Sequence, residues 1–235
     1  MSALLEARNL TKIHQPGTRS EVRALEGVSL SVAAGICVAF TGPSGSGKTT
    51  LLALLGVLER PTHGQVLFHG RDLRSDSDSE LTRNRRKMGF IFQDFALIPS
   101  LPVWENITYP LIPRGVLRRD RLKQAQSLLD QLGMPDKLNE RPHELSGGEQ
   151  QRVAIARALA GCPEVILADE PTSNLDTASA DEVISILKHT HAMGTTLILS
   201  SHDPRLLAIA ETVYQLSSGR LAATHSPPSA TTSRD

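Results

Sequence analysis

The chain has 235 residues, of which 40% are apolar, and its 25 Lys and Arg residues balance 25 Asp and Glu residues. This length fits one domain with a modest subdomain and buries about 70% of the unfolded surface, which excludes a disulfide-stapled miniprotein. The composition excludes a disordered chain, and the zero net charge gives no reason to expect a nucleic acid as a partner.

The apolar runs are too short to cross a membrane. The longest, residues 51–58, falls far below the about 20 residues that a membrane helix needs. Glu6, Arg8 and Asn9 interrupt the N-terminus, where a secretory signal needs a continuous apolar core. We therefore expect a cytosolic protein.

The N-terminal third predicts β-structure around one strand–turn–helix unit. Apolar residues at strand spacing predict antiparallel strands within residues 1–30, and residues 64–73 continue this pattern. Between them, the apolar run 36–40 precedes a Gly-rich turn and a helix that must stop before Pro61. One face of that helix carries Leu51, Leu52, Leu54, Leu55 and Leu58.

Residues 42–49 of that turn read G-P-S-G-S-G-K-T, which fits the phosphate-binding pattern G-x-x-x-x-G-K-[ST]. The glycines let successive backbone N–H groups point inward, and the following helix adds its positive N-terminal end. Lys48 is expected to reach the β- and γ-phosphate oxygens, and the Thr49 hydroxyl to bind Mg²⁺. A Gly-rich turn with an adventitious lysine is the alternative. The predicted nucleotide-binding residues are Gly42, Pro43, Ser44, Gly45, Ser46, Gly47, Lys48, Thr49 and Thr50.

Residues 94–160 predict a helical insertion subdomain. Apolar periodicity predicts one helix over 122–132, ended by Gly133, and another from about 148 to 160, ended by Gly161. Just before this region, residues 83–87 form a basic run that we interpret as a solvated face, because the chain has no net charge.

Two further apolar runs, 165–168 and 196–200, predict buried parallel strands. Ligands bind at the carboxyl ends of such strands, and the first run ends in Asp169 and Glu170. Asp169 is expected to bind Mg²⁺ and Glu170 to act as the general base for water, although an acidic pair can also cap a helix. The alternation of strands and helices predicts an α/β fold of the P-loop NTPase class with a parallel core sheet.

The two cysteines lie far apart in the sequence and belong to no cluster with metal-ligand spacing. Free cysteines are usually buried. We therefore expect Cys37 and Cys162 to be buried, reduced thiols.

Residues 145–152 read L-S-G-G-E-Q-Q-R, and with this motif the chain resembles the ATP-binding cassette (ABC) ATPases. The resemblance covers about residues 4–221 and extends to Gln93, S-N-L-D at 173–176 and His202 in S-S-H-D. It implies one ABC ATPase domain, residues 1–221, with a RecA-like core, an antiparallel β subdomain and the helical insertion. We expect residues 222–235 to be a disordered tail, because they are rich in Pro, Ser and Thr.

The signature motif also has a physical interpretation. Ser146, Gly147 and Gly148 offer a hydroxyl and free N–H groups at the positive end of a helix, which is a second anion-binding feature. In the family, the signature of one subunit closes over the γ-phosphate held by the P-loop of the other. The resemblance therefore implies a head-to-tail ATP-sandwich dimer, with ATP bound in trans by Ser146, Gly147, Gly148, Glu149 and Asp176.

The resemblance also implies roles for single residues. Gln93 would contact Mg²⁺ or the attacking water, and His202 would contact the γ-phosphate and hold Glu170 or the water in place. The implied catalytic residues are Glu170, His202, Gln93 and Lys48. The implied Mg²⁺ ligands are Thr49, Gln93 and Asp169.

One position departs from the family pattern. Where an aromatic residue usually stacks on the adenine, after L-T-K-x, this chain has His14. An imidazole stacks with less area than a phenol ring. We therefore predict weak base discrimination, with ATP and GTP bound within about tenfold of each other.

Asn174 and the segment E-N-I-T-Y-P-L-I at 105–112 make the chain similar to one exporter group. That group contains the lipoprotein-releasing ATPases, the macrolide and antimicrobial-peptide exporters and the cell-division cassette. The similarity implies a peripheral ATPase at the cytoplasmic face of the inner membrane that drives a separate transmembrane permease. The permease is expected to dock on the segment Phe95–Trp104, through Phe95, Leu97, Ile98, Leu101, Val103 and Trp104.

Three other functions stay open. An importer cassette for polar amino acids or methionine would carry the same motifs, and so would a force-transmitting regulator of cell-wall hydrolases. An ABC ATPase of DNA repair or translation would have a long coiled-coil insertion, a zinc site or two cassettes, and this sequence shows none of these. The transported substrate is set by the partner and is not encoded in this chain.

Overall fold

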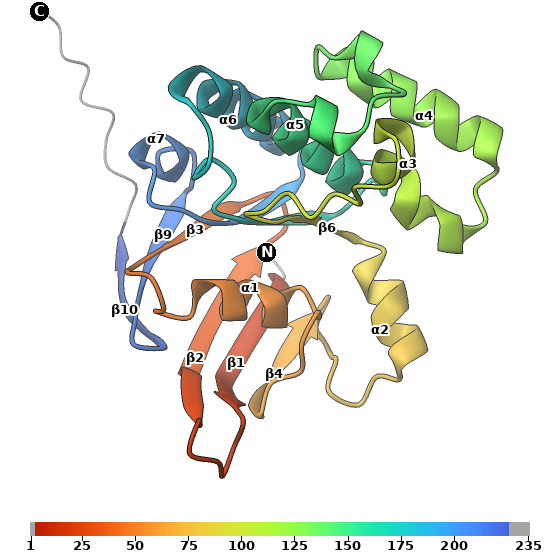
Figure 1. The fold of residues 1–235 in the computed structure, drawn as a ribbon. Helices are drawn as coiled ribbons and strands as arrows, with labels where there is room; N and C mark the ends of the chain where they lie inside the picture. Colours follow the sequence, from red (N-terminus) through yellow and green to blue (C-terminus); the bar gives the residue numbers. More distant parts are fainter. Residues whose placement is uncertain (1–2, 226–235) are drawn as a thin grey trace, which may run out of the picture.

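The computed structural model describes residues 3–225, which form two β-sheets with helices between and around them (Figure 1). The larger sheet has six strands in the order β10-β9-β3-β8-β7-β6, and the smaller has four in the order β2-β1-β4-β5. Within residues 3–225, no helix combines the length and the apolarity needed to span a bilayer.

The six-stranded sheet is the core, and five of its strands run parallel. The central strands are short apolar runs buried on both faces, as parallel strands usually are. The antiparallel strand β10 closes one edge by pairing with β9. The strands are β3 (Cys37–Thr41), β6 (Met88–Ile91), β7 (Val165–Asp169), β8 (Thr196–Ser200), β9 (Thr212–Ser217) and β10 (Arg220–His225).

The four-stranded antiparallel sheet faces the core sheet across helix α1 (Lys48–Leu55) (Figure 1). Alternate residues of each core strand point to opposite faces, so Val38 and Phe40 pack towards α1 and this second sheet. The apolar face of α1 fills the space between the two sheets. The strands are β1 (Ala3–His14), β2 (Val22–Ala33), β4 (His63–Phe68) and β5 (Arg71–Asp72).

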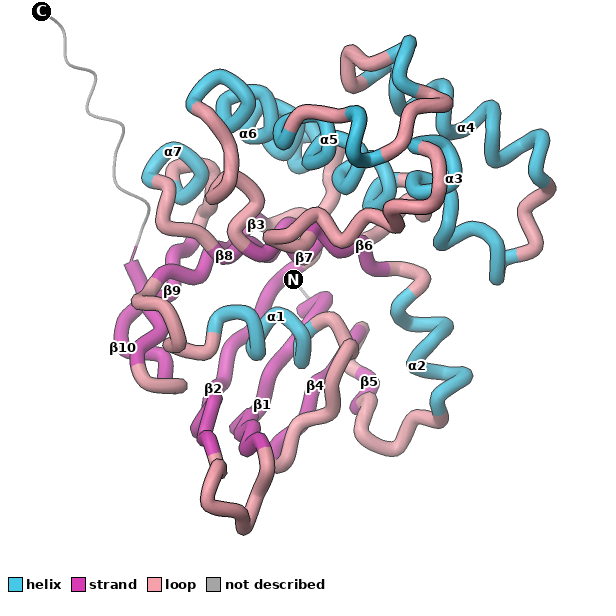
Figure 2. Tube along the Cα trace, viewed as in Figure 1, coloured by secondary structure: helices cyan, strands magenta, loops and turns pink. Residues whose placement is uncertain are grey.

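Three helices, α5 (Gly147–Leu159), α6 (Thr177–Ala192) and α7 (Pro204–Leu207), cover the other face of the core sheet (Figure 2). Cys37 and Ala39 of β3 pack against them. Beside α5 a third cluster forms the helical part of the fold around Trp104, Ile107 and Leu129. Its elements are α3 (Val103–Thr108), η1 (Tyr109–Arg114), α4 (Arg118–Gln131), η2 (Pro135–Lys137) and η3 (Pro142–Glu144), and α2 (Asp78–Arg85) precedes β6.

This architecture confirms the predicted α/β class with its parallel core sheet and antiparallel β-structure. The helix predicted after the Gly-rich turn spans Lys48–Leu55, so it stops before Pro61 as expected but does not include Leu58. Gly56 ends it where the Phe90 ring leaves no space, since a Cβ on Gly56 would lie 2.3 Å from that ring.

Two expectations need correction. The tail was expected to be disordered from Ala222, but Ala222 to His225 belong to β10, in which Ala223, Thr224 and His225 pair with β9, while residues 226–235 fall outside the described part. Cys162 was expected to be buried but is exposed. Cys37 is buried, and this burial raises the pKa of its thiol to about 12, so it stays protonated at neutral pH.

Candidate functional site

A cavity of about 650 Å³ opens at the carboxyl ends of the core strands. Residues from several distant segments line it, which agrees with the position of ligand sites in open α/β sheets. The lining includes most of the predicted site: Ser44, Gly45, Gly47, Lys48, Thr49, Thr50, Gln93, Asp169, Glu170 and His202.

The loop before α1 is folded tightly enough that two of its glycines are irreplaceable. Gly42 has φ +144°, and a Cβ there would lie 2.0 Å from the Leu216 carbonyl oxygen. Gly47 has φ +105°, and a Cβ there would lie 2.5 Å from the Ala24 carbonyl oxygen. Left-handed backbone and close approach both require glycine. Three of the predicted residues in this loop, Gly42, Pro43 and Ser46, do not line the cavity.

The Lys48 ammonium is buried in the cavity wall at 8% exposure. It donates hydrogen bonds to the carbonyl oxygens of Gly42 at 2.7 Å and Pro43 at 3.3 Å. It also lies 3.2 Å from His202 Nε2 and 3.9 Å from Glu170 Oε1. The two carbonyls thus hold the ammonium group at the floor of the loop. An anion that enters the loop can replace these neutral acceptors as the partner of Lys48.

Ser200 at the end of β8 fixes both acidic residues. Its hydroxyl donates to Asp169 Oδ1 at 2.5 Å, and the Glu170 N–H donates to the Ser200 carbonyl and hydroxyl oxygens, both at 3.1 Å. Glu170 adopts φ +45°, which directs the chain away from β7. Ser200 was not among the predicted site residues, although its position two residues before His202 was a usable signal.

The Glu170 carboxylate faces two nitrogen groups. Its Oε1 lies 3.3 Å from His202 Nε2, and the side chain is only 13% exposed. At Nε2, a neutral His202 can donate to Glu170 or accept from Lys48, but not both. An anion that binds Lys48 therefore frees His202 to donate to Glu170, which would hold this carboxylate as an acceptor for a water proton.

The Gln93 loop is held from two sides. The Gln93 carbonyl accepts from Asn174 Nδ2 at 3.1 Å. Phe95 and Ala96 follow with φ of +61° and +46°, an uncommon backbone conformation for non-glycine residues. The guanidinium of Arg157 on α5 donates to the Phe95 carbonyl at 2.7 Å and the Ala96 carbonyl at 2.5 Å. Burial lowers the pKa of Arg157. Arg157 was not among the predicted site residues, and its only signal was a basic residue inside an apolar helix face.

We expect Arg157→Gln to lower kcat for ATP about tenfold while the affinity for ATP stays within about twofold, because only the loop that carries Gln93 is displaced. Arg157→Lys should restore part of kcat, since one ammonium can replace one of the two hydrogen bonds. Steady-state kinetics and ATP titration measure both quantities.

Gln124→Ala is the matched control, since it removes a 2.7 Å bond from a side chain to the Ala160 carbonyl at the end of the same helix. It should lower stability but not kcat. A kcat that falls equally in this control would show that Arg157 acts only on stability.

The signature residues form a second cluster, outside the cavity lining. Ser146 caps α5: its hydroxyl accepts from the Glu149 N–H at 3.3 Å, and Glu149 Oε2 accepts from the Ser146 N–H at 2.8 Å. This N–H bond lowers the pKa of Glu149. Gly148 packs so closely on α6 that a Cβ would lie 2.5 Å from Ser179 Oγ.

Asp176 joins this second cluster through the same serine. It caps α6, accepting from the Ser179 N–H at 3.0 Å and from the Ser179 hydroxyl at 2.7 Å. The backbone hydrogen bond from Ser179 lowers the pKa of Asp176. The structure thus brings together all the residues expected to act in trans and keeps them out of the cavity lining of their own chain.

Strand β2 supplies one part of the cavity lining. His14 is not among the lining residues, whereas Val22, Arg23 and Ala24 of β2 are. His14 pairs with Val22 across the β1–β2 ladder, so the hairpin register presents β2 to the cavity. His14 therefore lies directly beside a lining residue, and both its stacking on the base and the similar binding of ATP and GTP stay predictions.

Two of the expected docking residues are unavailable. Val103 and Trp104 are 0% and 4% exposed and pack inside the helical part. The guanidinium carbons of Arg118 and Arg121 lie 5.0 and 5.4 Å from the centre of a Trp104 ring. Phe95 is half-buried. A groove of about 370 Å³ lies nearby and includes Leu58, Phe90, Phe92, Pro110 and Pro113 among its lining residues.

The cavity has donors that fit a hard divalent cation. Thr49, Gln93 and Asp169 line it together and provide hydroxyl, amide and carboxylate oxygens. Mg²⁺ prefers oxygen ligands and usually keeps several waters and phosphate oxygens beside one or two carboxylates. Among the described residues, no group of three or more His, Cys, Asp or Glu side chains is placed to hold a metal ion.

Comparisons with known proteins agree with this site. The family profile described as "ABC transporter" matches residues 25–173. The lipoprotein-releasing system ATP-binding protein LolD of Geobacter metallireducens is 44% identical over 95% of this chain and 100% of its own length. The macrolide export ATP-binding/permease protein MacB of Nitrosomonas europaea is 44% identical over 94% of this chain, which spans only 34% of that longer protein.

The fold of this chain is also similar to that of a solved ATP-binding cassette. The dimeric post-hydrolysis state of the ATP-binding cassette MJ0796, bound to ADP and Pi, superposes with a TM-score of 0.88. It is 38% identical, and the match covers 95% of this chain and 99% of that one. The similarity therefore extends through both sheets and the helical part.

Proposed function

Because this chain belongs to the family of ABC transporter ATPases, we propose that its hydrolysis of ATP drives a separate transmembrane permease that exports or releases a substrate. The observation that carries the proposal is the grouping of Lys48, Glu170 and His202 in one cavity, with the signature of the same chain elsewhere. The relatives LolD and MacB are named for lipoprotein release and macrolide export.

In the proposed reaction, the P-loop N–H groups and Lys48 bind the phosphates, and Lys48 leaves the Gly42 and Pro43 carbonyls to do so. Glu170 accepts a proton from the attacking water, and His202 holds that carboxylate in position. Thr49, Gln93 and Asp169 would hold Mg²⁺, which neutralises charge on the phosphate oxygens.

Two copies of this chain are proposed to form each ATP site together. The signature cluster of one copy, with Ser146, Gly147 and Asp176, would close the cavity of the other head to tail. The dimeric state of MJ0796 supports this arrangement. Two identical cassettes then form two composite sites, each completed by an anion-binding helix end.

The permease is proposed to dock in the 370 Å³ groove, with half-buried Phe95 at its margin in place of Trp104. This groove adjoins the Gln93 loop, since Arg157 both lines the groove and holds the Phe95 and Ala96 carbonyls. Docking would place the chain at the cytoplasmic face of the inner membrane. A movement of the Gln93 loop would thus change the shape of the surface on which the permease docks.

Affinity purification from detergent-solubilised membranes of the native host tests this function. We expect a tagged chain to retain a membrane protein with a large extracytoplasmic domain. Leu58→Glu, at a groove residue that is 41% exposed, should lose this partner. Met193→Glu, at a residue that is 75% exposed at the end of α6, is the matched control and should keep it.

Three results would contradict the proposal. A short permease with a binding protein would favour the importer, and a partner bound to a cell-wall hydrolase would favour the force-transmitting regulator. Retention of the membrane protein by Leu58→Glu would show that the groove is not its docking site.

A further inference from the structure

The basic residues of this neutral chain are concentrated at one edge of the fold. Residues 83–87 and 109–123 together contain nine Lys or Arg and one Asp, so these 20 residues carry a net charge of +8, whereas the whole chain has none. We call them the basic surface: Arg83, Arg85, Arg86, Lys87, Arg114, Arg118, Arg119, Arg121 and Lys123.

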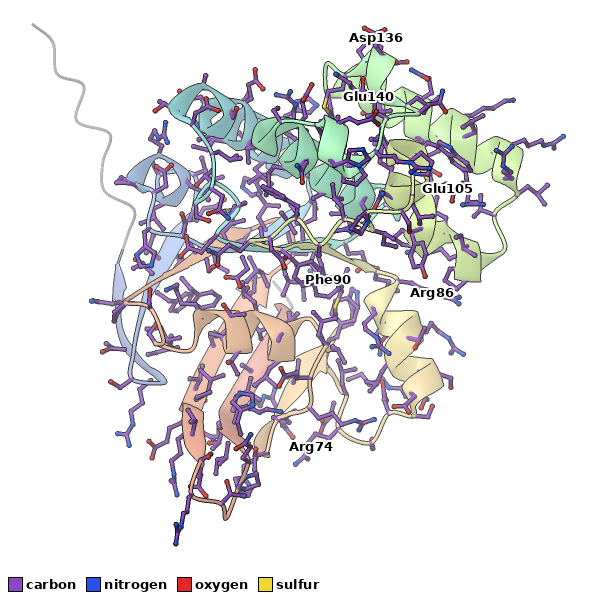
Figure 3. The ribbon with its side chains drawn as sticks, in the orientation of Figure 1. Arg74, Arg86, Phe90, Glu105, Asp136 and Glu140 are labelled. Carbon is purple, nitrogen blue, oxygen red and sulfur yellow. The ribbon has the colours of Figure 1, made fainter. Side chains whose placement is uncertain are left out.

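The two segments are joined in space. An Arg86 guanidinium N–H donates to the Pro113 carbonyl at 3.0 Å, and Arg114 hydrogen-bonds to the Arg86 carbonyl. Figure 3 shows Arg86 where α2 meets the helical part of the fold. The end of α2, the 3₁₀ helix η1 and the start of α4 therefore form one continuous surface.

Seven of these nine cations have no carboxylate partner among the described residues. Arg83, Arg86, Arg118, Arg119 and Lys123 are exposed. Within residues 3–225, Lys87 pairs with Glu164 and Arg119 with its neighbour Asp120, while the other members have no carboxylate within 4.0 Å. Cations this close together repel one another. The same charges spread over the whole protein would therefore destabilise the fold less, unless a bound anion neutralises the repulsion.

Apolar side chains accompany the charges. Tyr109, Ile112 and Leu117 are 50%, 48% and 59% exposed, and they are three of the six exposed large hydrophobic residues of the described chain. Tyr109 and Ile112 lie in η1, and Leu117 directly precedes α4, so all three belong to the basic segment 109–123. Arginine beside exposed aromatic and aliphatic groups is the composition that binds the interface of a bilayer, where headgroups are anionic and the acyl boundary is apolar.

We propose that the basic surface binds anionic phospholipids directly, with guanidinium groups on the headgroup phosphates and Leu117 and Ile112 at the acyl boundary. The surface adjoins the groove proposed for the permease, since Arg85, Arg86 and Arg114 also line that groove. Lipid binding goes beyond the proposed function and does not require the permease.

Flotation of the purified chain with vesicles tests the proposal. We expect binding to vesicles that contain phosphatidylglycerol and none to vesicles of phosphatidylcholine alone, and added salt should weaken the binding. Arg118→Glu/Arg119→Glu should reduce the affinity about tenfold or more, since each basic residue near an anionic surface strengthens binding several-fold. Leu117→Asp should also reduce it.

Arg19→Glu/Lys188→Glu is the matched control, because it makes the same charge change at two other exposed positions. It should bind vesicles as the unmodified chain does, and all variants should keep their ATPase activity. Absence of binding to anionic vesicles at low salt would overturn the proposal, and would favour an acidic protein as the occupant. Equal loss of binding in the control would overturn it too. Neither result would touch the proposed ATPase function.

Discussion

Glu170→Gln should abolish most ATP hydrolysis and leave a dimer that ATP holds together. The amide cannot take a proton from water, and loss of a general base lowers turnover by at least about 100-fold. ATP binding should persist, because Lys48 is held mainly by loop carbonyls and lies 3.9 Å from Glu170 Oε1. Light scattering after size exclusion, with and without ATP and Mg²⁺, measures the dimer, and phosphate release measures turnover.

Glu164→Gln is the matched control for this substitution. Glu164 directly precedes β7, but its carboxylate contacts His69 and Lys87 outside the cavity. The control should hydrolyse ATP normally and show no stable dimer. If Glu170→Gln binds ATP but stays monomeric, then either the permease must first align two cassettes or the signature is not used in trans, and the expected dimer of the chain alone would be wrong.

The parts of the site that could be predicted are those encoded in short segments. The P-loop follows β3 and leads into α1, and the pair Asp169–Glu170 lies at the end of β7, so local sequence was enough to place them together at one end of the core sheet. The signature helix begins at Gly147, within one residue of the expected start.

The parts that were missed depend on long-range register. Val22, Arg23 and Ala24 line the cavity because of how β1 pairs with β2, which no single segment specifies. Trp104 is buried because α4 brings Arg118 and Arg121 over its ring. Residues 223–225 extend a strand because β9 offers an edge to pair with. Each miss reflects a partner from a distant part of the chain.

Gly147→Asp should lower the rate of ATP hydrolysis by at least about 100-fold without destabilising the monomer. The reason is that the new carboxylate would face the nucleotide bound by the other subunit. A Cβ on Gly147 would lie 3.8 Å from its nearest neighbours, the Asn174 carbonyl and Leu175, which is ordinary contact. A carboxylate in the first turn of α5 also interacts favourably with the positive end of the helix dipole. The monomer should therefore fold normally and bind ATP with unchanged affinity.

Ser79→Asp is the matched control, since it places the same charge in the first turn of α2, at an exposed position outside both clusters. It should hydrolyse ATP at the normal rate. Combining Gly147→Asp with Glu170→Gln should remove the ATP-held dimer, because the new charge opposes the γ-phosphate across the interface. If the combined variant still dimerises with ATP, the signature does not contact nucleotide in trans, and the two anion-binding helix ends of this chain would serve separate purposes.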